Sequence, residues 1–176
     1  GEKESQINLD IAKKLDWILS FCGEAPMMLR NEDVSLHDST AQTIREKKVS
    51  DLKHRVELVN QQTSATLVSI HQNSYSDSAI HGAQVFYYAT STSGKNLAEA
   101  LQNILVKNLD PKNHRQAKAN DSYYLLKKTT KPIVIVECGF LSNPTESALL
   151  KSDSYQDEIA WVLHLGILQQ LNQTRK

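Results

Sequence analysis

The stretch that decides the fold is Pro132-Ile133-Val134-Ile135-Val136-Glu137-Cys138-Gly139-Phe140-Leu141-Ser142-Asn143-Pro144. Its run of four β-branched aliphatic residues predicts a strand that is buried on both faces, as in parallel sheets. A carboxylate, Glu137, follows at the carboxyl end of that run. In open α/β sheets ligands bind at this end of the strands, so Glu137 either pairs with a cation or takes part in chemistry.

The rest of the chain alternates between the helical and the extended pattern. Apolar residues at helical spacing predict helices over 6–22, 44–60, 93–109 and 159–171, and shorter apolar runs predict strands over 26–30, 65–71 and 83–88. Asn143 and Pro144 form a helix-start signal, a capping residue followed by a proline of the first turn. The alternation predicts a single α/β domain over residues 1–176, with a mostly parallel twisted sheet flanked by helices.

The composition excludes several kinds of partner. The 176 residues carry 20 Lys and Arg against 20 Asp and Glu, and aromatic residues make up only 6%. We therefore expect no nucleic-acid partner, because such surfaces are basic and often aromatic. No stretch has the length and apolarity of a membrane span, and no signal peptide is visible. Cys22 and Cys138 are expected to be small buried hydrophobic residues.

Three side chains stand apart from the packing pattern. His71 ends a predicted strand, Glu137 ends another, and Glu4 stands just before the first predicted helix. Because strand ends and helix starts meet at one rim of such a sheet, the three could converge into a zinc site with a catalytic base. Each also has a purely structural interpretation: a hydrogen-bonded His71, a Glu137 paired with a cation, and a Glu4 that stabilises a helix dipole.

Several motifs, in order along the whole chain, resemble the zinc-dependent N-acetylmuramoyl-L-alanine amidases of the amidase-3 type. The matching stretches are Glu4-Ser5-Gln6-Ile7-Asn8-Leu9, the Arg55 to Asn60 helix end, Ser69-Ile70-His71-Gln72-Asn73-Ser74, Gly82 to Tyr88, Asn113 to Lys127, and Val136 to Glu146. The Glu137 motif is the most specific of these. The His71 and Glu137 motifs are similar to those of the spore-germination branch of the family.

The resemblance implies a function and assigns the three side chains. Glu4 and His71 match two ligands of a Zn²⁺ ion, and Glu137 matches the catalytic glutamate. The implied reaction is hydrolysis of the amide between N-acetylmuramic acid and L-alanine in peptidoglycan, which places the protein in the cell wall or outside the cell. The loop 74–82 and the connection 111–121 are expected to wall the groove for the glycan strand and its stem peptide.

In one respect the chain departs from the family pattern. The segment Asp-x-Gly-His-Gly-Gly, which carries the first histidine ligand at the end of the first strand, has no counterpart here. Either the chain is a piece of a complete amidase, or it is a degenerate member that binds peptidoglycan or regulates without catalysis. His81 is a weak candidate for a substitute ligand. Without the first strand, its neighbours are expected to present an open edge.

Overall fold

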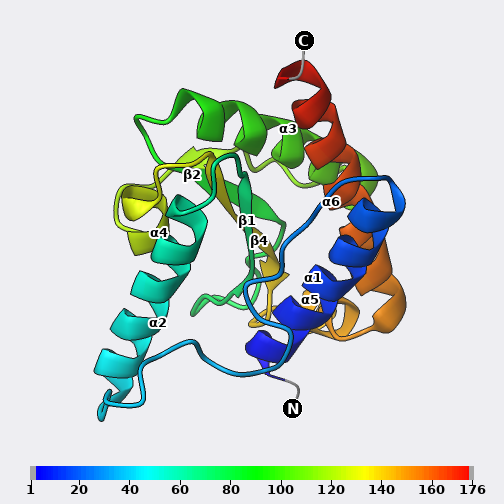
Figure 1. Ribbon diagram of the computed structural model, residues 1–176. Coiled ribbons are helices and arrows are strands. Elements are labelled where there is room, and N and C mark those ends of the chain that lie inside the picture. Colours follow the sequence, from blue (N-terminus) through cyan, green and yellow to red (C-terminus); the bar gives the residue numbers. More distant parts are fainter. Residues whose placement is uncertain (1–2, 175–176) are drawn as a thin grey trace.

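The structure is a computed structural model that describes residues 3–174, and it combines helices with one sheet (Figure 1). The elements in chain order are α1 (Glu4–Phe21), α2 (Ile44–Asn60), β1 (Leu67–Asn73), β2 (Gln84–Tyr87), α3 (Thr92–Asn108), β3 (Lys118–Ala119), α4 (Tyr124–Lys128), β4 (Ile133–Phe140), α5 (Pro144–Leu150) and α6 (Asp153–Thr174). None of these helices, within the described residues, is long and apolar enough to cross a membrane.

The four strands lie in the order β1-β4-β2-β3. β1 runs parallel to β4, β2 runs antiparallel to β4, and β3 runs parallel to β2. All eight residues of β4 are buried, as its continuous apolar run predicts for an interior strand. The predicted fold class, an α/β fold with a mostly parallel sheet between helices, is therefore confirmed.

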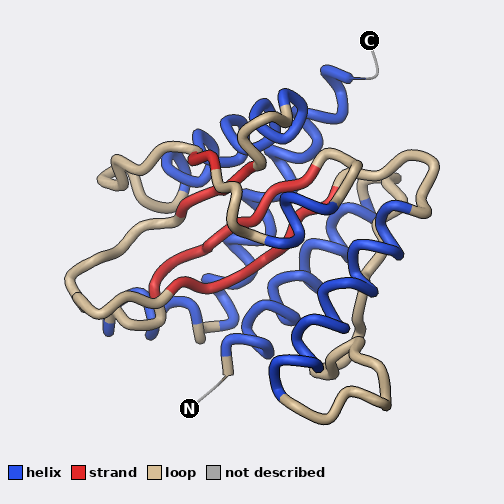
Figure 2. The backbone as a smooth tube through the Cα atoms, turned by 90° about the vertical axis from the view of Figure 1, so that its left-hand side faces the viewer, coloured by secondary structure: helices blue, strands red, loops and turns tan. Residues whose placement is uncertain are grey.

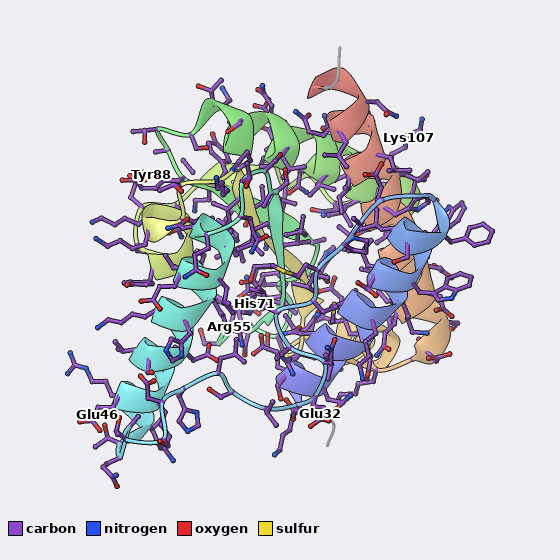
Figure 3. The ribbon with its side chains drawn as sticks, in the orientation of Figure 1. Glu32, Glu46, Arg55, His71, Tyr88 and Lys107 are labelled. Atoms are coloured by element: carbon purple, nitrogen blue, oxygen red, sulfur yellow. The ribbon has the colours of Figure 1, made fainter. Side chains whose placement is uncertain are left out.

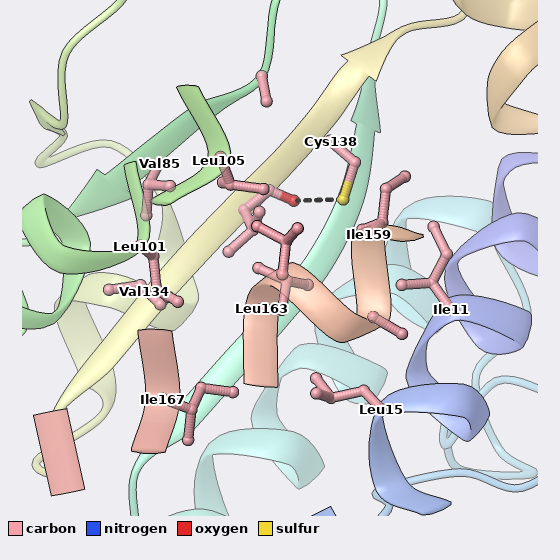
Figure 4. Close-up of a cluster of buried hydrophobic side chains, with 14 of the residues drawn as sticks. Ile11, Leu15, Val85, Leu101, Leu105, Val134, Cys138, Ile159, Leu163 and Ile167 are labelled. Atoms are coloured by element: carbon pink, nitrogen blue, oxygen red, sulfur yellow. Dashed lines mark hydrogen bonds between the residues drawn. The ribbon is translucent and has the colours of Figure 1, made fainter. Parts of the chain in front are cut away.

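Helices cover both faces of the sheet (Figure 2). On one face, Val134, Val136 and Cys138 of β4 pack in a large cluster with α1, α3 and α6, part of which is drawn in Figure 4. On the other face, Ile133 and Ile135 pack in a smaller cluster with α2 and α4. Neighbouring residues of β4 thus pack into different hydrophobic clusters, because successive side chains of a strand point to opposite faces of the sheet.

The structure corrects three predictions. Residues 26–30 are not a strand: within the described chain their backbone groups make no hydrogen bond to another backbone group, so they have no ladder. The two-residue strand β3 lies within residues 111–121, for which the sequence pattern predicts a connection without a strand. Cys22 is exposed at the end of α1, whereas Cys138 is buried as expected.

The boundaries of two helices also differ. α1 begins at Glu4 itself, so Glu4 belongs to the first turn instead of preceding the helix. α6 begins at Asp153, six residues before the predicted start. The predicted start of α5 is confirmed, since Asn143 Oδ1 accepts from the backbone N–H of Thr145 and Glu146, and Pro144 stands in the first turn.

Candidate metal centre

The fold brings Glu4, His71 and Glu137 together from three elements. Glu4 lies in the first turn of α1, with its Oε1 3.3 Å from Nδ1 of His71. His71 near the end of β1 is paired in parallel register with Glu137 of β4. The convergence predicted from the strand ends and the helix start therefore occurs in the structure.

Three donors hold the Glu4 carboxylate in place. Its Oε1 accepts from Asn8 Nδ2 at 3.2 Å and from the backbone N–H of Gln72 at 3.3 Å, beside the contact with His71. The hydrogen bond with His71 is the main cause that lowers the pKa of Glu4, and burial opposes it. Glu4 is thus fixed as an anion, which is the form that a metal ligand requires.

The imidazole of His71 has a partner at each nitrogen. Nδ1 faces Glu4, and Nε2 lies 3.1 Å from Oγ of Ser69, two residues earlier on the same face of β1. In the hydrogen bond to Glu4, Nδ1 carries the proton; a metal ion in this position would instead take the Nδ1 lone pair, and Nε2–H would then donate to Ser69 Oγ. Motif matching did not single out Ser69, although its i, i+2 spacing from His71 was the available signal.

Glu137 is a buried carboxyl group, and one of its oxygens lacks a hydrogen bond that would offset the cost of burial. The residue is 8% exposed, and its Oε2 has no hydrogen-bond partner among the described residues. Burial raises the pKa of Glu137, the charge of Glu4 raises it further, and the charge of His71 opposes the rise. A carboxyl group with a raised pKa is poised to accept and release a proton, as a general base must be.

Glu4 and His71 fit two positions of a zinc ion. Two ligands of a tetrahedral zinc, each about 2.0–2.1 Å from the metal, lie about 3.3 Å apart. The Glu4 Oε1 to His71 Nδ1 distance is 3.3 Å. Residues 3–174 contain no group of three or more metal-binding side chains, so this pair is an incomplete ligand set. His81 adds nothing to it, because its Nδ1 lies 3.7 Å from Asp110 Oδ2 instead.

A cavity of about 640 Å³ adjoins Glu4 and His71. Figure 3 shows His71 of β1 and Arg55 of α2 in the space between α1 and α2, and both line this cavity. The guanidinium of Arg55 is held by Asp51, with Nε 2.6 Å from Oδ2 and Nη2 3.1 Å from Oδ1. The lining of the cavity thus combines charged side chains with apolar ones, which are Leu9, Ala12, Leu52, Val68, Ile70 and Leu125 among others.

Comparison with known proteins places the chain in a family. Residues 1–169 match the amidase-3 family of N-acetylmuramoyl-L-alanine amidases. The germination-specific N-acetylmuramoyl-L-alanine amidase of Bacillus subtilis is 34% identical over 166 residues, which cover 94% of this chain and 70% of that protein. The amidase LytC of the same organism is 29% identical over 168 residues, and only 31% of its length is covered.

Solved structures show the same likeness. The CwlD amidase from Clostridioides difficile, solved in complex with the GerS lipoprotein, has a TM-score of 0.91 and 37% identity, over 95% of this chain and 85% of that one. The amidase AmiC2 of Nostoc punctiforme has a TM-score of 0.79 and 29% identity, over 95% and 83% of the two chains. The chain belongs to the amidase-3 family of N-acetylmuramoyl-L-alanine amidases.

Proposed function

We propose that this protein hydrolyses the amide bond between N-acetylmuramic acid and L-alanine in peptidoglycan, with Zn²⁺ as cofactor, in the cell wall. The observation that carries the proposal is the convergence of Glu4, His71 and Glu137 on one rim of the sheet. Membership of a family of cell-wall amidases supports the substrate.

Each of the three residues has a separate role. Glu4 and His71 would hold the zinc, and Ser69 would fix the imidazole by accepting a hydrogen bond from its Nε2–H. When bound, zinc polarises a carbonyl and lowers the pKa of a water molecule to about 7. Glu137 accepts the proton of the attacking water and delivers it to the nitrogen of L-alanine as the amide bond breaks.

The loops beside Glu137 are suited to contact an extended substrate. Arg115 joins the connection 111–121 to the loop 74–82, since its Nε donates to the carbonyl of His81 at 2.9 Å. Its Nη1 lies 3.3 Å from Oε1 of Gln84, and Gln84 pairs with Glu137 in the sheet. These contacts support the expectation that both loops wall the groove for the glycan strand and stem peptide.

A second candidate function is a non-catalytic domain that binds peptidoglycan or regulates another protein. The incomplete ligand set favours it, because catalytic zinc sites use three protein ligands. The two candidates share the groove and differ in whether zinc is bound tightly and the amide is cleaved.

Zinc titration of the metal-free protein by calorimetry at neutral pH, with turnover of purified peptidoglycan measured alongside, separates the two candidates. The hydrolase predicts one-to-one zinc binding that is lost in His71→Ala, together with release of new amino termini from peptidoglycan. His54→Ala is the control, because His54 on α2 lines neither the cavity beside Glu4 and His71 nor the two loops proposed to wall the groove. Absence of zinc binding up to high micromolar concentration, with peptidoglycan bound but not cleaved, contradicts the hydrolase and supports the binding domain.

A further inference from the structure

Arg115 is a half-buried cation that has no carboxylate partner within residues 3–174. Its Nε donates to the His81 carbonyl at 2.9 Å, and its Nη1 lies 3.3 Å from Oε1 of Gln84. A guanidinium has five N–H donors, so one on Nη1 and both on Nη2 meet no acceptor in the described chain. Such free donors are the groups with which arginine binds carboxylates.

The two arginines that line the cavity beside the candidate metal centre already have counter-charges. Nε of Arg55 lies 2.6 Å from Oδ2 of Asp51, and Nη1 of Arg30 lies 3.3 Å from Oδ1 of Asp33. A charge that is partly removed from water is costly unless an opposite charge offsets it. Arg115 is therefore the arginine beside the site that is best placed to bind an anionic group of a ligand.

The guanidinium of Arg115 lies on the same face of the sheet as Glu137. Gln84 of β2 is directly opposite Glu137 of β4, and paired residues of a sheet have their side chains on one face. The contact with Gln84 Oε1 therefore places Arg115 on that face. Its Cζ also lies 4.9 Å from the centre of the Phe140 ring, at the carboxyl end of β4. Arg115 thus stands one strand beyond the proposed catalytic base.

The spacing of the strands matches the spacing of residues in an extended peptide. Neighbouring strands lie about 4.8 Å apart, and each residue of an extended chain spans about 3.3–3.6 Å. The two loops that are expected to wall the groove, 74–82 and 111–121, flank β2. With the scissile amide beside Glu137 and the stem peptide running towards β2, the residue after L-alanine lies next to Gln84. A carboxylate on that residue is then within reach of Arg115.

We propose that Arg115 binds the carboxylate of the residue that follows L-alanine in the stem peptide, and so selects ligands that are anionic at that position. The proposal rests on the proposed hydrolase function, since it takes the position of the scissile amide from Glu137. The half-buried guanidinium favours such an ion pair, because fewer water molecules screen it than on an open surface. Arg115 therefore binds substrate in addition to joining the two loops.

The test compares two synthetic ligands that differ in one group. N-acetylmuramoyl-L-alanyl-D-glutamine has a single carboxylate, on the residue after L-alanine, and its C-terminal amide has a neutral carboxamide there. Binding to chelator-treated protein, in which neither ligand is cleaved, is followed by NMR titration. The wild type should bind the carboxylate about tenfold more tightly or better, the usual strength of hydrogen bonds to a charged group. Equal affinity for the two ligands, or binding of neither, overturns the proposal.

Variants separate carboxylate binding from the structure of the loops. Arg115→Gln should bring the ratio of the two affinities close to one, and Arg115→Lys, which keeps the charge without the fork, should retain part of the preference. A purely structural role of Arg115 would weaken both ligands alike and leave the ratio unchanged, which overturns the proposal. Lys107→Gln, at an exposed position in the last turn of α3, is the control for the loss of one positive charge and should keep the wild-type ratio.

Cleavage of the same two ligands in the presence of zinc tests the proposed function separately. A retained preference in binding, lost in Arg115→Gln, without cleavage of either ligand contradicts the hydrolase and supports the carboxylate site. Cleavage of both ligands with equal kcat/KM and equal affinity contradicts the carboxylate site and supports the hydrolase.

Discussion

His71 and Glu137 lie directly opposite each other on neighbouring parallel strands, paired in register within the sheet. Parallel strands lie about 4.8 Å apart, and in-register side chains leave on the same face. An imidazole and a buried carboxyl group therefore share one face at the carboxyl end of the sheet. This pairing follows from the strand register, and it places the proposed base beside a proposed zinc ligand.

Replacing Glu137 by Gln should lower the rate of amide hydrolysis by about 10²- to 10⁴-fold, the usual contribution of a general base. The amide keeps the shape of the side chain but does not accept the proton. The measurement is release of amino termini from purified peptidoglycan, with Glu99→Gln on the exposed face of α3 as control. More than a tenth of wild-type activity in Glu137→Gln would contradict the role of this residue as base.

The same substitution should change the pH dependence of stability. Burial raises the pKa of Glu137 in the folded protein above its ordinary value of 4.5. A raised carboxyl pKa means that the folded state binds the proton more tightly, so wild-type stability falls as pH rises from about 4.5. Glu137→Gln removes this loss, and its free energy of unfolding relative to wild type should increase between pH 4 and pH 8.

Denaturant unfolding at a series of pH values measures that difference. Glu99→Gln, on a solvated surface, should show no comparable trend. A constant difference between Glu137→Gln and wild type across the range would mean that the pKa of Glu137 is not raised.

Ser69→Ala should weaken zinc binding about tenfold or more while leaving the ligands in place. Ser69 is the partner of His71 Nε2, and loss of such outer contacts costs about 10- to 100-fold in metal affinity. Calorimetric titration with zinc provides the test, with the exposed Ser64→Ala as control. Equal zinc affinity in Ser69→Ala and wild type would show that the hydroxyl does not orient the imidazole.

Gln102→Met should destabilise the protein by about 1–3 kcal/mol, the cost of leaving the buried Val85 N–H unpaired, while the Ala83 carbonyl keeps its hydrogen bond from Asn113 Nδ2 at 2.9 Å. Gln102 is a buried residue of α3 whose Oε1 accepts from the Val85 N–H at 2.8 Å and whose Nε2 donates to the Ala83 carbonyl at 3.1 Å. Asn103→Met, exposed on the same helix, is the control in urea unfolding. An unchanged midpoint for Gln102→Met would show that water replaces these contacts.

The two cysteines should differ sharply in reactivity. Cys138 is buried, and burial raises the pKa of its thiol to about 12, so almost no thiolate forms at neutral pH. Cys22 is exposed at the end of α1. Native protein treated with iodoacetamide should therefore be modified at Cys22 alone, as judged by peptide mass spectrometry. Modification of Cys138 at a similar rate would indicate frequent opening of the core.

The sequence anticipated much of the candidate site because its signals are local. The strand that bears Glu137 is marked by a continuous β-branched run, and the start of α5 by an adjacent cap and proline. Ser69 was missed because its importance comes from a contact with His71 instead of from a motif. The prediction of a strand at 26–30 is wrong, because apolar residues form a strand only where a partner strand pairs with their backbone N–H and C=O groups.

By itself the sequence determined the α/β fold class, the family resemblance and the candidates for catalytic and metal-binding residues, since periodicity and motifs are properties of short stretches. Only the tertiary structure decided that Glu4 reaches His71 at 3.3 Å, that Glu137 is buried with one oxygen unpaired among residues 3–174, and that β1 is the end strand of the sheet in those residues. These features depend on strand order and register, which are set by contacts between residues far apart in the chain.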